Sequence, residues 1–564
     1  MSTYIDELVP AIAPHVEMDA AEVRELIATP PDPELGDFAF PCFKLAKALH
    51  RPPAAIAEDL AARIVEAGLP ARFDRVEAVG PFVNFGVDAA RRAQSVLDAV
   101  RSEGERYGSG TDGVGKTVVM DYSHPNIAKP FGIGHLRSTV IGGALYRIHK
   151  FLGWNAVGVN HLGDWGTQFG KLITAFRRWG HGNPAEQSIE QLYDLYVRFH
   201  REVEDDPGLE EEGRAWHRSM EDGDEEALAL WRGFRQASLT EFKRIYEILE
   251  VDFDSWAGES FYIDRLDDAV RLAIDKGVAT EDDGAIIVDF HDDQLGVWLL
   301  RKSDGATLYS TRDLAAAIYR AEAYHFDKLL YVVGAPQARH FAQLFETLRL
   351  MGYEWWDRCV HVSFGQILGM STRKGTLVFL DEVVTQAVER VARIIEERNP
   401  ELDDKEDIAR KVGIGAIVFA DLSRRRIRDY QFDWEEILSF DGETGPYVQY
   451  THARLCSILR KYDRPVPPAY DPGLYPTPEE AACVRGLEAF PEAVRQAADE
   501  HEPYFIAHYL IELATVANAF YQKHRVIDPA DERLESARIV LVDALRQVLG
   551  NGLRLLGVHG PERM

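Results

Sequence analysis

Residues 121–140 read DYSHPNIAKPFGIGHLRSTV and follow directly on an apolar run at 118–120. The run predicts a strand, the prolines and glycines predict a loop, and from His135 onward apolar residues recur at helical spacing. In a strand, loop and buried helix, the helix N-terminus lies at the strand ends, where its unpaired N–H groups favour phosphates. Gly132 and Gly134 let a ligand approach the backbone, and His135 can donate to a phosphoryl oxygen. The stretch therefore predicts a nucleotide site.

Strands and helices alternate again further along the chain. Runs at 156–160, 328–333 and 360–364 predict strands, and a helix is expected at about 337–350. Such alternation predicts a parallel sheet with ligands at its switch point. Long charged helices and a hairpin-like patch interrupt the pattern from about 190 to 300. We interpret this segment as an insertion between two halves of a Rossmann-like nucleotide-binding fold.

The predicted fold class is α/β, with several domains as the length of 564 residues requires. We expect an N-terminal α/β domain at 1–112, which ends in a glycine-rich linker. The Rossmann-like domain with its insertion follows at 113–400, and connecting helices follow at 401–445. Residues 446–564 are almost wholly helical in pattern, which predicts an all-α C-terminal domain.

The composition predicts a soluble, cytoplasmic, globular protein without membrane contact. Hydrophobic residues make up 46% and aromatic residues 10%, no run of about eighteen apolar residues occurs, and the first residues lack a basic region followed by an apolar one. The four cysteines are widely scattered, with no CxxC and no Cys/His cluster. We therefore expect neither a disulfide nor a zinc site, nor any other resident metal.

The net charge of −29 argues at first against a nucleic-acid partner. Much of the acid, however, is concentrated at 202–226 and 400–407, whereas basic residues cluster at 424–428 and 454–464. An acidic body with local basic tracks can bind RNA selectively and repel other polyanions.

The string from Ser123 to Thr139 closely resembles the first signature of the class I arginyl-tRNA synthetases. The family form of its four-residue box has histidine at both ends, whereas Gly132-Ile133-Gly134-His135 has glycine first. The replacement removes one candidate phosphate donor and leaves His135. We expect Lys129, or water in the vacated space, to supply a further phosphate contact beside it. His124 stands where the family commonly has a serine, and it is a candidate for the amino-acid pocket.

A second resemblance lies in ILGMSTRKGTLVFLDEV at 367–383. Alone, this string would be an ordinary basic turn, but its order and distance from His135 match the second class I signature. The two signature lysines are absent, as in a subset of the family, and Arg373 and Lys374 keep the charge. The resemblance implies ATP contacts at Met370, Ser371, Thr372 and Lys374.

The third match is LYSTRDLAAAIYR at 308–320, where Tyr309 and Asp313 are four residues apart and share a helix face. From the spacing alone, Asp313 would more simply complement a helix N-terminus. The resemblance instead implies that Tyr309, Asp313 and Gln337 hold the arginine side chain, and that Asn126 holds its backbone groups. A guanidinium fork pairs bidentately with a carboxylate, which suits the assignment.

Both ends of the chain resemble tRNA-binding domains of the same family. The N-terminal part implies contact with the tRNA D-loop through Phe82 and Asn84; the alternative makes Phe82 a core residue and Asn84 a turn residue. Asp543-Ala544-Leu545-Arg546 resembles the motif that names the anticodon-binding domain, and the chain ends at Met564 as the family does. The candidate tRNA contacts there are Tyr447, Tyr450, Arg454 and Met564, although an aromatic stripe at helical spacing usually belongs to a core.

Taken together, the resemblance implies an arginine–tRNA ligase with ATP, L-arginine and tRNA(Arg) as partners. Mg²⁺ is expected with ATP, and a monomer is expected. Arginyl-adenylate would form first, and the 2′-hydroxyl of the terminal adenosine would then accept the arginyl group. The expected catalytic residues are His135, Lys129, Gly134, Arg373 and Lys374. Two alternatives remain at this point, a small-molecule nucleotidyltransferase with a Gly-x-Gly-His helix start and a catalytically silent tRNA-binding relative.

Overall fold

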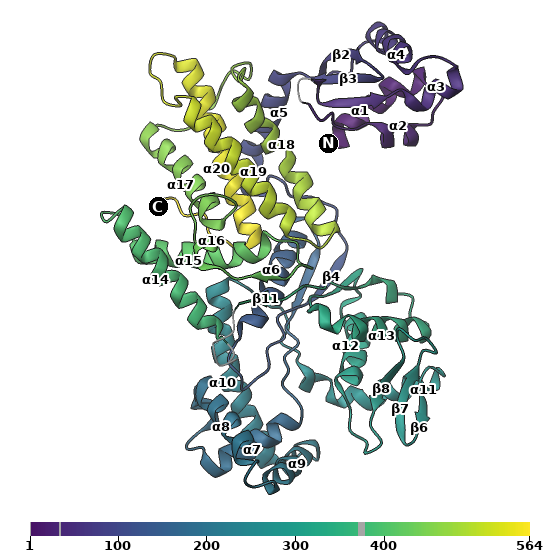
Figure 1. The fold of residues 1–564 in the computed structure, drawn as a ribbon, viewed down its shortest axis with the longest axis vertical. Coiled ribbons are helices and arrows are strands. Elements are labelled where there is room, and N and C mark those ends of the chain that lie inside the picture. Colours follow the sequence, from purple (N-terminus) through teal and green to yellow (C-terminus); the bar gives the residue numbers. More distant parts are fainter. Residues whose placement is uncertain (1, 33–34, 370–377) are drawn as a thin grey trace. The chain divides into compact units, whose positions relative to one another are not determined.

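A computed structural model describes residues 2–32, 35–369 and 378–564 of the chain. The described residues form two compact units. The first contains Met1–Gly108, Arg454–Glu492 and Glu512–Leu549, and the second contains Ser109–Ala453, Ala493–Ile511 and Gly550–Met564. Figure 1 labels the elements of both.

In the second unit, strands and helices alternate as the sequence predicts. The α-helices are α1 Ser2–Ile12, α2 Ala20–Leu26, α3 Phe43–Leu49, α4 Pro53–Ala67, α5 Ala89–Glu103, α6 Leu136–Phe151, α7 Thr167–Trp179, α8 Ile189–Glu202, α9 Gly208–Glu221, α10 Glu225–Leu249, α11 Leu266–Asp275, α12 Tyr309–Tyr324, α13 Ala338–Leu350, α14 Leu380–Arg398, α15 Lys405–Leu422, α16 Trp434–Ile437, α17 Gly445–Tyr462, α18 Pro478–Asp499, α19 Tyr504–Lys523 and α20 Glu532–Leu556. The strands are β1 Phe38–Pro41, β2 Phe73–Val79, β3 Phe82–Val87, β4 Thr117–Asp121, β5 Asn155–Val159, β6 Thr280–Asp282, β7 Ala285–Asp289, β8 Val297–Arg301, β9 Lys328–Tyr331, β10 Cys359–His361, β11 Ile367–Leu368 and β12 Tyr430–Gln431.

A parallel sheet in the order β10-β9-β4-β5 forms the centre of the second unit. Met120 on β4 pairs with Leu330 on one side and Gly158 on the other, and the apolar residues of β4 are fully buried. The predicted parallel sheet is confirmed. The strands at 328–333 and 360–364 are shorter than predicted, and Val333 and Phe364, which lie beyond the strand ends, line a cavity described below.

Helix α6 is buried on almost every side, whereas its spacing predicted one buried face. A Cβ at Gly142 would collide with the Tyr122 ring, and one at Gly143 would lie 3.1 Å from Val251. Arg147 donates to the carbonyl of Leu555 at 3.2 Å. The helix is thus covered by chain segments from far along the sequence, which periodicity cannot register.

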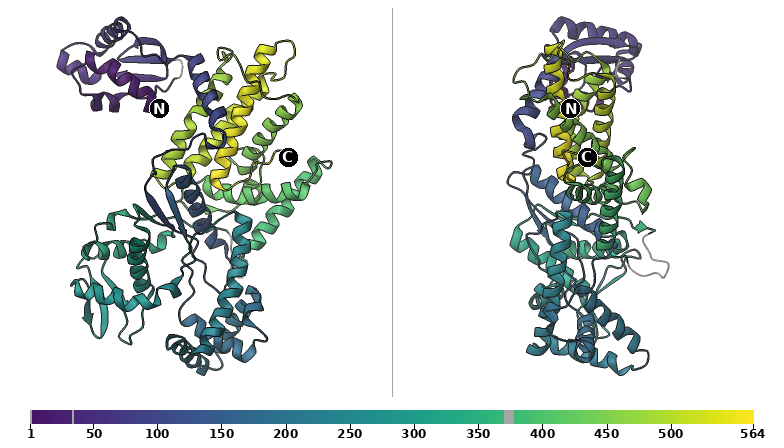
Figure 2. Two further views of the ribbon diagram at one scale, coloured as in Figure 1. Left: turned by 180° about the vertical axis from the view of Figure 1, so that it is seen from behind. Right: turned by 90° about the vertical axis from the view of Figure 1, so that its left-hand side faces the viewer.

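The predicted insertion contains the charged helices α8, α9 and α10 and an antiparallel sheet in the order β6-β7-β8. Trp298 on β8, Leu314 on α12 and Phe341 on α13 belong to one hydrophobic core. Figure 2 shows this group of teal helices and strands from behind. The small sheet therefore supports two helices of the nucleotide-binding fold.

The first unit contains an antiparallel sheet in the order β1-β3-β2, with Phe38, Phe40 and Phe85 in its core together with residues of α1 and α4. Helix α4 begins at Pro53, directly after Pro52. All four cysteines of the chain are free and buried. Among the described helices, none is long and apolar enough to cross a membrane.

Candidate active site

A cavity of about 510 Å³ opens at the carboxyl ends of β4 and β9. Three segments line it: the loop and helix start between Ser123 and Ser138, the turn from Val333 to Gln337, and the segment 364–367. Since the strands are parallel, their ends bring these segments to the same edge of the sheet. The cavity lies where the sequence predicted a nucleotide site.

The loop from Ser123 to Ala128 has an unusual backbone. Ser123, His124 and Ala128 have φ angles of 81°, 53° and 59°, the left-handed region that side chains disfavour. Hydrogen bonds hold this shape: Ser123 N–H donates to Ser138 Oγ at 2.8 Å, and Ala128 N–H donates to Ser238 Oγ at 2.8 Å. Strained backbone that is held in this way is typical of a functional site.

Gly134 and His135 begin the signature helix, in a 3₁₀ turn that precedes α6. A Cβ at Gly134 would meet nothing within 4 Å, so packing does not require glycine there and the space is open to a ligand. Burial, helped by the charges of His124 and Lys129, lowers the pKa of His135 to about 4. The ring is therefore neutral near pH 7. Its Nδ1 is buried without a hydrogen-bond partner among the described residues.

Gly132 is buried and pairs with Phe379 in an isolated antiparallel bridge. Ile133 N–H donates to the Val378 carbonyl at 3.1 Å, so the box is joined to the later part of the 367–383 segment. The candidates in that signature, Met370, Ser371, Thr372, Arg373 and Lys374, lie outside the described residues.

Lys129 does not line the cavity. Its ammonium lies 5.3 Å from the centre of the Tyr196 ring on α8, a cation–π contact with the insertion. Within the described part of the chain, no carboxylate pairs with it. Its charge nevertheless acts on the ring of His135.

His124, Asn126 and Gln337 line the same cavity as His135. His124 Nε2 lies 2.7 Å from Asp121 Oδ1, and a Cβ at Gly163 would collide with Asn126 Oδ1. Gly163 therefore leaves the room that the Asn126 amide occupies. The structure brings together three of the five residues that the resemblance implies for arginine.

The other two, Tyr309 and Asp313, do not line that cavity and lie around His340 instead. Helix α12 begins at Tyr309, so Asp313 is more than one turn inside it and does not cap it. Asp313 Oδ2 accepts a hydrogen bond from His340 Nε2 at 2.6 Å. The Tyr309 side chain is 59% exposed, and its ring centre lies 4.9 Å from that of His340.

Arg137 is a cavity residue that the sequence analysis missed. It is only 1% exposed, its Nε lies 3.1 Å from Asp421 Oδ2, and its Nη1 donates to the Arg428 carbonyl at 2.9 Å. Segment 426–431 in turn supports the cavity wall, since Gly365 N–H donates to the Arg426 carbonyl at 2.9 Å and β11 pairs with β12. An arginine in the first turn of the predicted buried helix was the available signal.

Arginines of the basic cluster at 424–428 make contacts with other parts of the chain. Arg424 pairs with Glu436 at 2.5 Å, Arg425 lies over the rings of Tyr504 and Phe505, and Arg426 donates to the His501 carbonyl at 3.0 Å. Three of the four arginines of the cluster thus make contacts within the protein, whereas Arg428 is exposed.

The candidate tRNA contacts in the first unit differ in exposure. Phe82 is 37% exposed and meets the ring of Phe43, itself 55% exposed, edge to face at 5.5 Å. Asn84 is buried in the middle of β3, opposite Ala39 and Glu77, and not in a turn. Phe43, which the sequence analysis missed, completes an exposed aromatic pair.

The C-terminal candidates lie on or after α17. Tyr447 is partly exposed and Tyr450 is exposed. Arg454 follows one turn later, and its Nη1 donates to Asn518 Oδ1 at 2.6 Å. Met564 is partly exposed at the end of the chain. Within the described residues, no group of three or more His, Cys, Asp or Glu side chains could hold a metal ion.

Three family models match the chain. They are "tRNA synthetases class I (R), catalytic domain" over residues 97–434, "DALR anticodon binding domain" over 448–564, and "Arginyl tRNA synthetase N terminal domain" over 2–87. The chain is also 47% identical over 559 residues to an arginine–tRNA ligase of Clostridium perfringens, with 98% of each chain covered. An arginine–tRNA ligase of Clostridioides difficile is 46% identical over 553 residues, with 97% of each covered. The solved structure of Thermus thermophilus arginyl-tRNA synthetase covers 99% of both chains with a TM-score of 0.81 at 28% identity.

Proposed function

Because the chain belongs to the class I arginyl-tRNA synthetases and its activity is that of an arginine–tRNA ligase, we propose that both arginine and ATP bind in the cavity beside α6. One observation supports this most directly: Asn126 and Gln337, assigned to arginine, line the same space as Gly134 and His135, assigned to ATP. The full-length match favours neither the small-molecule nucleotidyltransferase nor the silent relative.

In the proposed reaction, the carboxylate of arginine attacks the α-phosphorus of ATP and pyrophosphate leaves. The 2′-hydroxyl of the terminal adenosine of tRNA then attacks the carbonyl carbon, and AMP leaves. Neither step needs a protein nucleophile, so the chain contributes alignment and charge stabilisation. Gly134 gives the triphosphate access to the helix N-terminus, and the neutral ring of His135 donates to a phosphoryl oxygen.

Further ATP contacts are proposed for Gly132, Lys129 and the stretch 370–374. The charge of Lys129 already acts on His135, which supports a role beside the phosphates. Mg²⁺ enters as part of the substrate, because phosphate oxygens are hard ligands that bind it well. His124, Asn126, Tyr309, Asp313 and Gln337 hold arginine.

We further propose a cytoplasmic monomer, in which the domain boundaries at 112, 400 and 445 separate tRNA-binding parts from the catalytic part. Free cysteines agree with a reducing compartment.

The proposed arginine and ATP sites are tested by ATP–pyrophosphate exchange with each amino acid in turn. Exchange is expected with arginine and, as the family resemblance implies, only when tRNA is present. The glycine at position 132 supports this, since a site with one phosphate donor fewer gains most from the docked acceptor end of the tRNA. Brisk exchange with arginine and ATP alone would disprove the dependence on tRNA, and exchange with another amino acid would disprove the site assignment.

For tRNA, we propose that Phe82 and Phe43 stack on an unpaired base and that Tyr447, Tyr450, Arg454 and Met564 contact the anticodon region. Asn84 is buried in β3 and pairs with β1, which holds in place the strand that carries Phe82. Exposed aromatic pairs are well suited to splayed bases.

Phe82→Ala is expected to raise the KM for tRNA by about 5- to 100-fold, since base stacking on an aromatic residue contributes about 1–3 kcal/mol. The KM values for arginine and ATP are expected to stay unchanged, and Phe43→Ala is expected to act in the same direction. Steady-state aminoacylation measures all three constants. Val65→Ala, which removes another exposed apolar side chain of the same unit, is the control. An unchanged KM for tRNA in both phenylalanine variants would exclude the stacking role.

A further inference from the structure

A chain of hydrogen bonds, buried at Trp298 and partly buried at Asp313, leads from the inserted sheet to Asp313. Trp298 Nε1 on β8 lies 3.3 Å from His340 Nδ1 on α13, and His340 Nε2 lies 2.6 Å from Asp313 Oδ2 on α12. An indole N–H can only donate, so Nδ1 accepts. In the neutral ring the hydrogen is then on Nε2, which donates to the carboxylate. Trp298 therefore selects the tautomer that can hold Asp313.

The second oxygen of the carboxylate also faces a histidine. His161 Nε2 lies 3.7 Å from Asp313 Oδ1, and its Nδ1 lies 3.5 Å from Arg320 Nη2. Burial lowers the pKa of His161, which keeps its ring neutral. An ionised carboxylate has about four acceptor positions. One acceptor position on each oxygen faces a histidine, so one acceptor position on each oxygen remains. A guanidinium fork needs this pattern for a bidentate pair.

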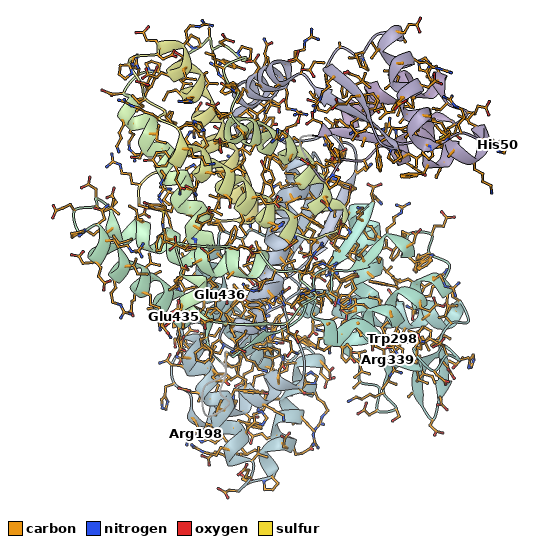
Figure 3. All side chains as sticks on the ribbon, turned by 45° about the horizontal axis from the view of Figure 1, so that its top comes forward. His50, Arg198, Trp298, Arg339, Glu435 and Glu436 are labelled. Atoms are coloured by element: carbon orange, nitrogen blue, oxygen red, sulfur yellow. The ribbon has the colours of Figure 1, made fainter. Side chains whose placement is uncertain are left out.

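His340 also contacts Tyr309, whose ring meets it edge to face with centres 4.9 Å apart. It thus touches two of the three residues proposed for the arginine side chain. The two helices that carry these residues are tied to the same strand and the loop before it: Ser310 and Thr311 donate to the carbonyls of Leu299 and Leu300, and Gln343 donates to that of Leu295 at 2.7 Å. Figure 3 labels Trp298 and Arg339 in this region.

We propose that His340 is a positioning residue for amino-acid recognition, which orients the Asp313 carboxylate and the Tyr309 ring toward the guanidinium of arginine, with Trp298 fixing its tautomer. This inference rests on the proposed role of Asp313. A carboxylate held in one orientation before binding loses less entropy when the ligand arrives. The inserted sheet, far from the phosphates, thereby contributes to arginine specificity.

Two amide substitutions separate the positioning role from a structural one. In His340→Gln the amide nitrogen reaches the place of Nε2 and can still donate to Asp313, whereas in His340→Asn it reaches only the place of Nδ1. We expect His340→Asn to raise the KM for arginine by about 10- to 100-fold, the range for one lost hydrogen bond to a charged group. His340→Gln is expected to stay within about threefold of the parent enzyme. The KM for ATP and the kcat at saturating arginine are expected to change little in both.

His361→Asn is the matched control, because it removes an Nε2 donor as His340→Asn does. His361 is a second histidine against the Phe341 ring, at 4.8 Å between centres compared with 5.3 Å for His340, but it donates to the Val333 carbonyl rather than to Asp313. It is expected to lower the melting temperature without changing the KM for arginine. Trp298→Phe keeps the core filled and removes the donor to Nδ1, so we expect a KM between those of His340→Gln and His340→Asn.

The KM values for arginine in these variants decide whether His340 positions Asp313. An equal KM for arginine in His340→Asn and His340→Gln, with both folded, would overturn the proposal. If His340→Asn does not fold, an unchanged KM in Trp298→Phe would overturn it. Asp313→Asn separates this failure from that of the site itself: if that variant keeps the parent KM, the role of Asp313 falls, whereas a raised KM there beside an unchanged His340→Asn removes only the role of His340.

Discussion

Asp313→Ala should lower kcat/KM for arginine by about 30- to several-thousand-fold, because truncating one partner of a buried, hydrogen-bonded charge pair costs about 2–5 kcal/mol. A guanidinium that leaves water must regain its hydrogen bonds, and this carboxylate supplies two of them with the compensating charge. Citrulline, which is uncharged, and lysine, which has no fork, are disfavoured by the parent enzyme for the same reason. Exchange rates with arginine and citrulline, measured in parent and variant, check both statements.

Asp327→Ala is the control for a purely structural aspartate. Asp327 Oδ2 accepts the Thr117 N–H at 2.8 Å and supports the start of β4. Its loss is expected to lower the melting temperature and to leave kcat/KM for arginine and the preference over citrulline intact. If Asp313→Ala behaves in this way too, Asp313 does not bind the guanidinium.

His135→Ala is expected to lower kcat for adenylate formation by about 10²- to 10³-fold, as the loss of a preorganised donor does. Arginine binding is expected to change little. Because burial lowers the pKa of His135 to about 4, the ring is already neutral in the free enzyme, and the loss is expected to be constant between about pH 6.5 and 8. Single-turnover adenylate formation across this range measures the effect.

His149→Ala provides the comparison on the same helix. His149 is buried, its Nδ1 bonds the Leu145 carbonyl at 2.9 Å, and burial lowers its pKa to about 4 as well. Its removal leaves a void in the core and is expected to lower the melting temperature without lowering the specific rate. If His135→Ala shows the same pattern, His135 is a core residue and not a phosphate donor.

Local patterns in the sequence predicted the parts of the site that lie close together in the chain. The strand at 118–120, the glycine loop and the helix after His135 form one continuous unit, so spacing and turn residues were sufficient. The insertion and its hairpin were recognised in the same way, by the change of period and charge.

Contacts between distant residues could not be predicted. The resemblance assigned Asp313 to the arginine side chain, but His340 and His161, which face it from other elements, were not identified. The cation–π contact between Lys129 and a ring of the insertion was not expected either. Asn84 fits a turn by composition, yet strand pairing on both sides buries it. In each case tertiary packing determines the contacts of the residue, and a single sequence carries no signal for such packing.

The ion pair between Arg137 and Asp421 bears on the smallest fragment that could remain active. The two residues are 284 positions apart and almost completely buried. A truncation near residue 400 would leave the guanidinium of the signature helix without its carboxylate, and breaking a buried pair costs about 3–5 kcal/mol. It would also remove β12, which pairs with the strand of the cavity wall. Excised catalytic fragments of this chain must therefore extend beyond residue 431, although the alternating pattern of strands and helices ends some thirty residues earlier.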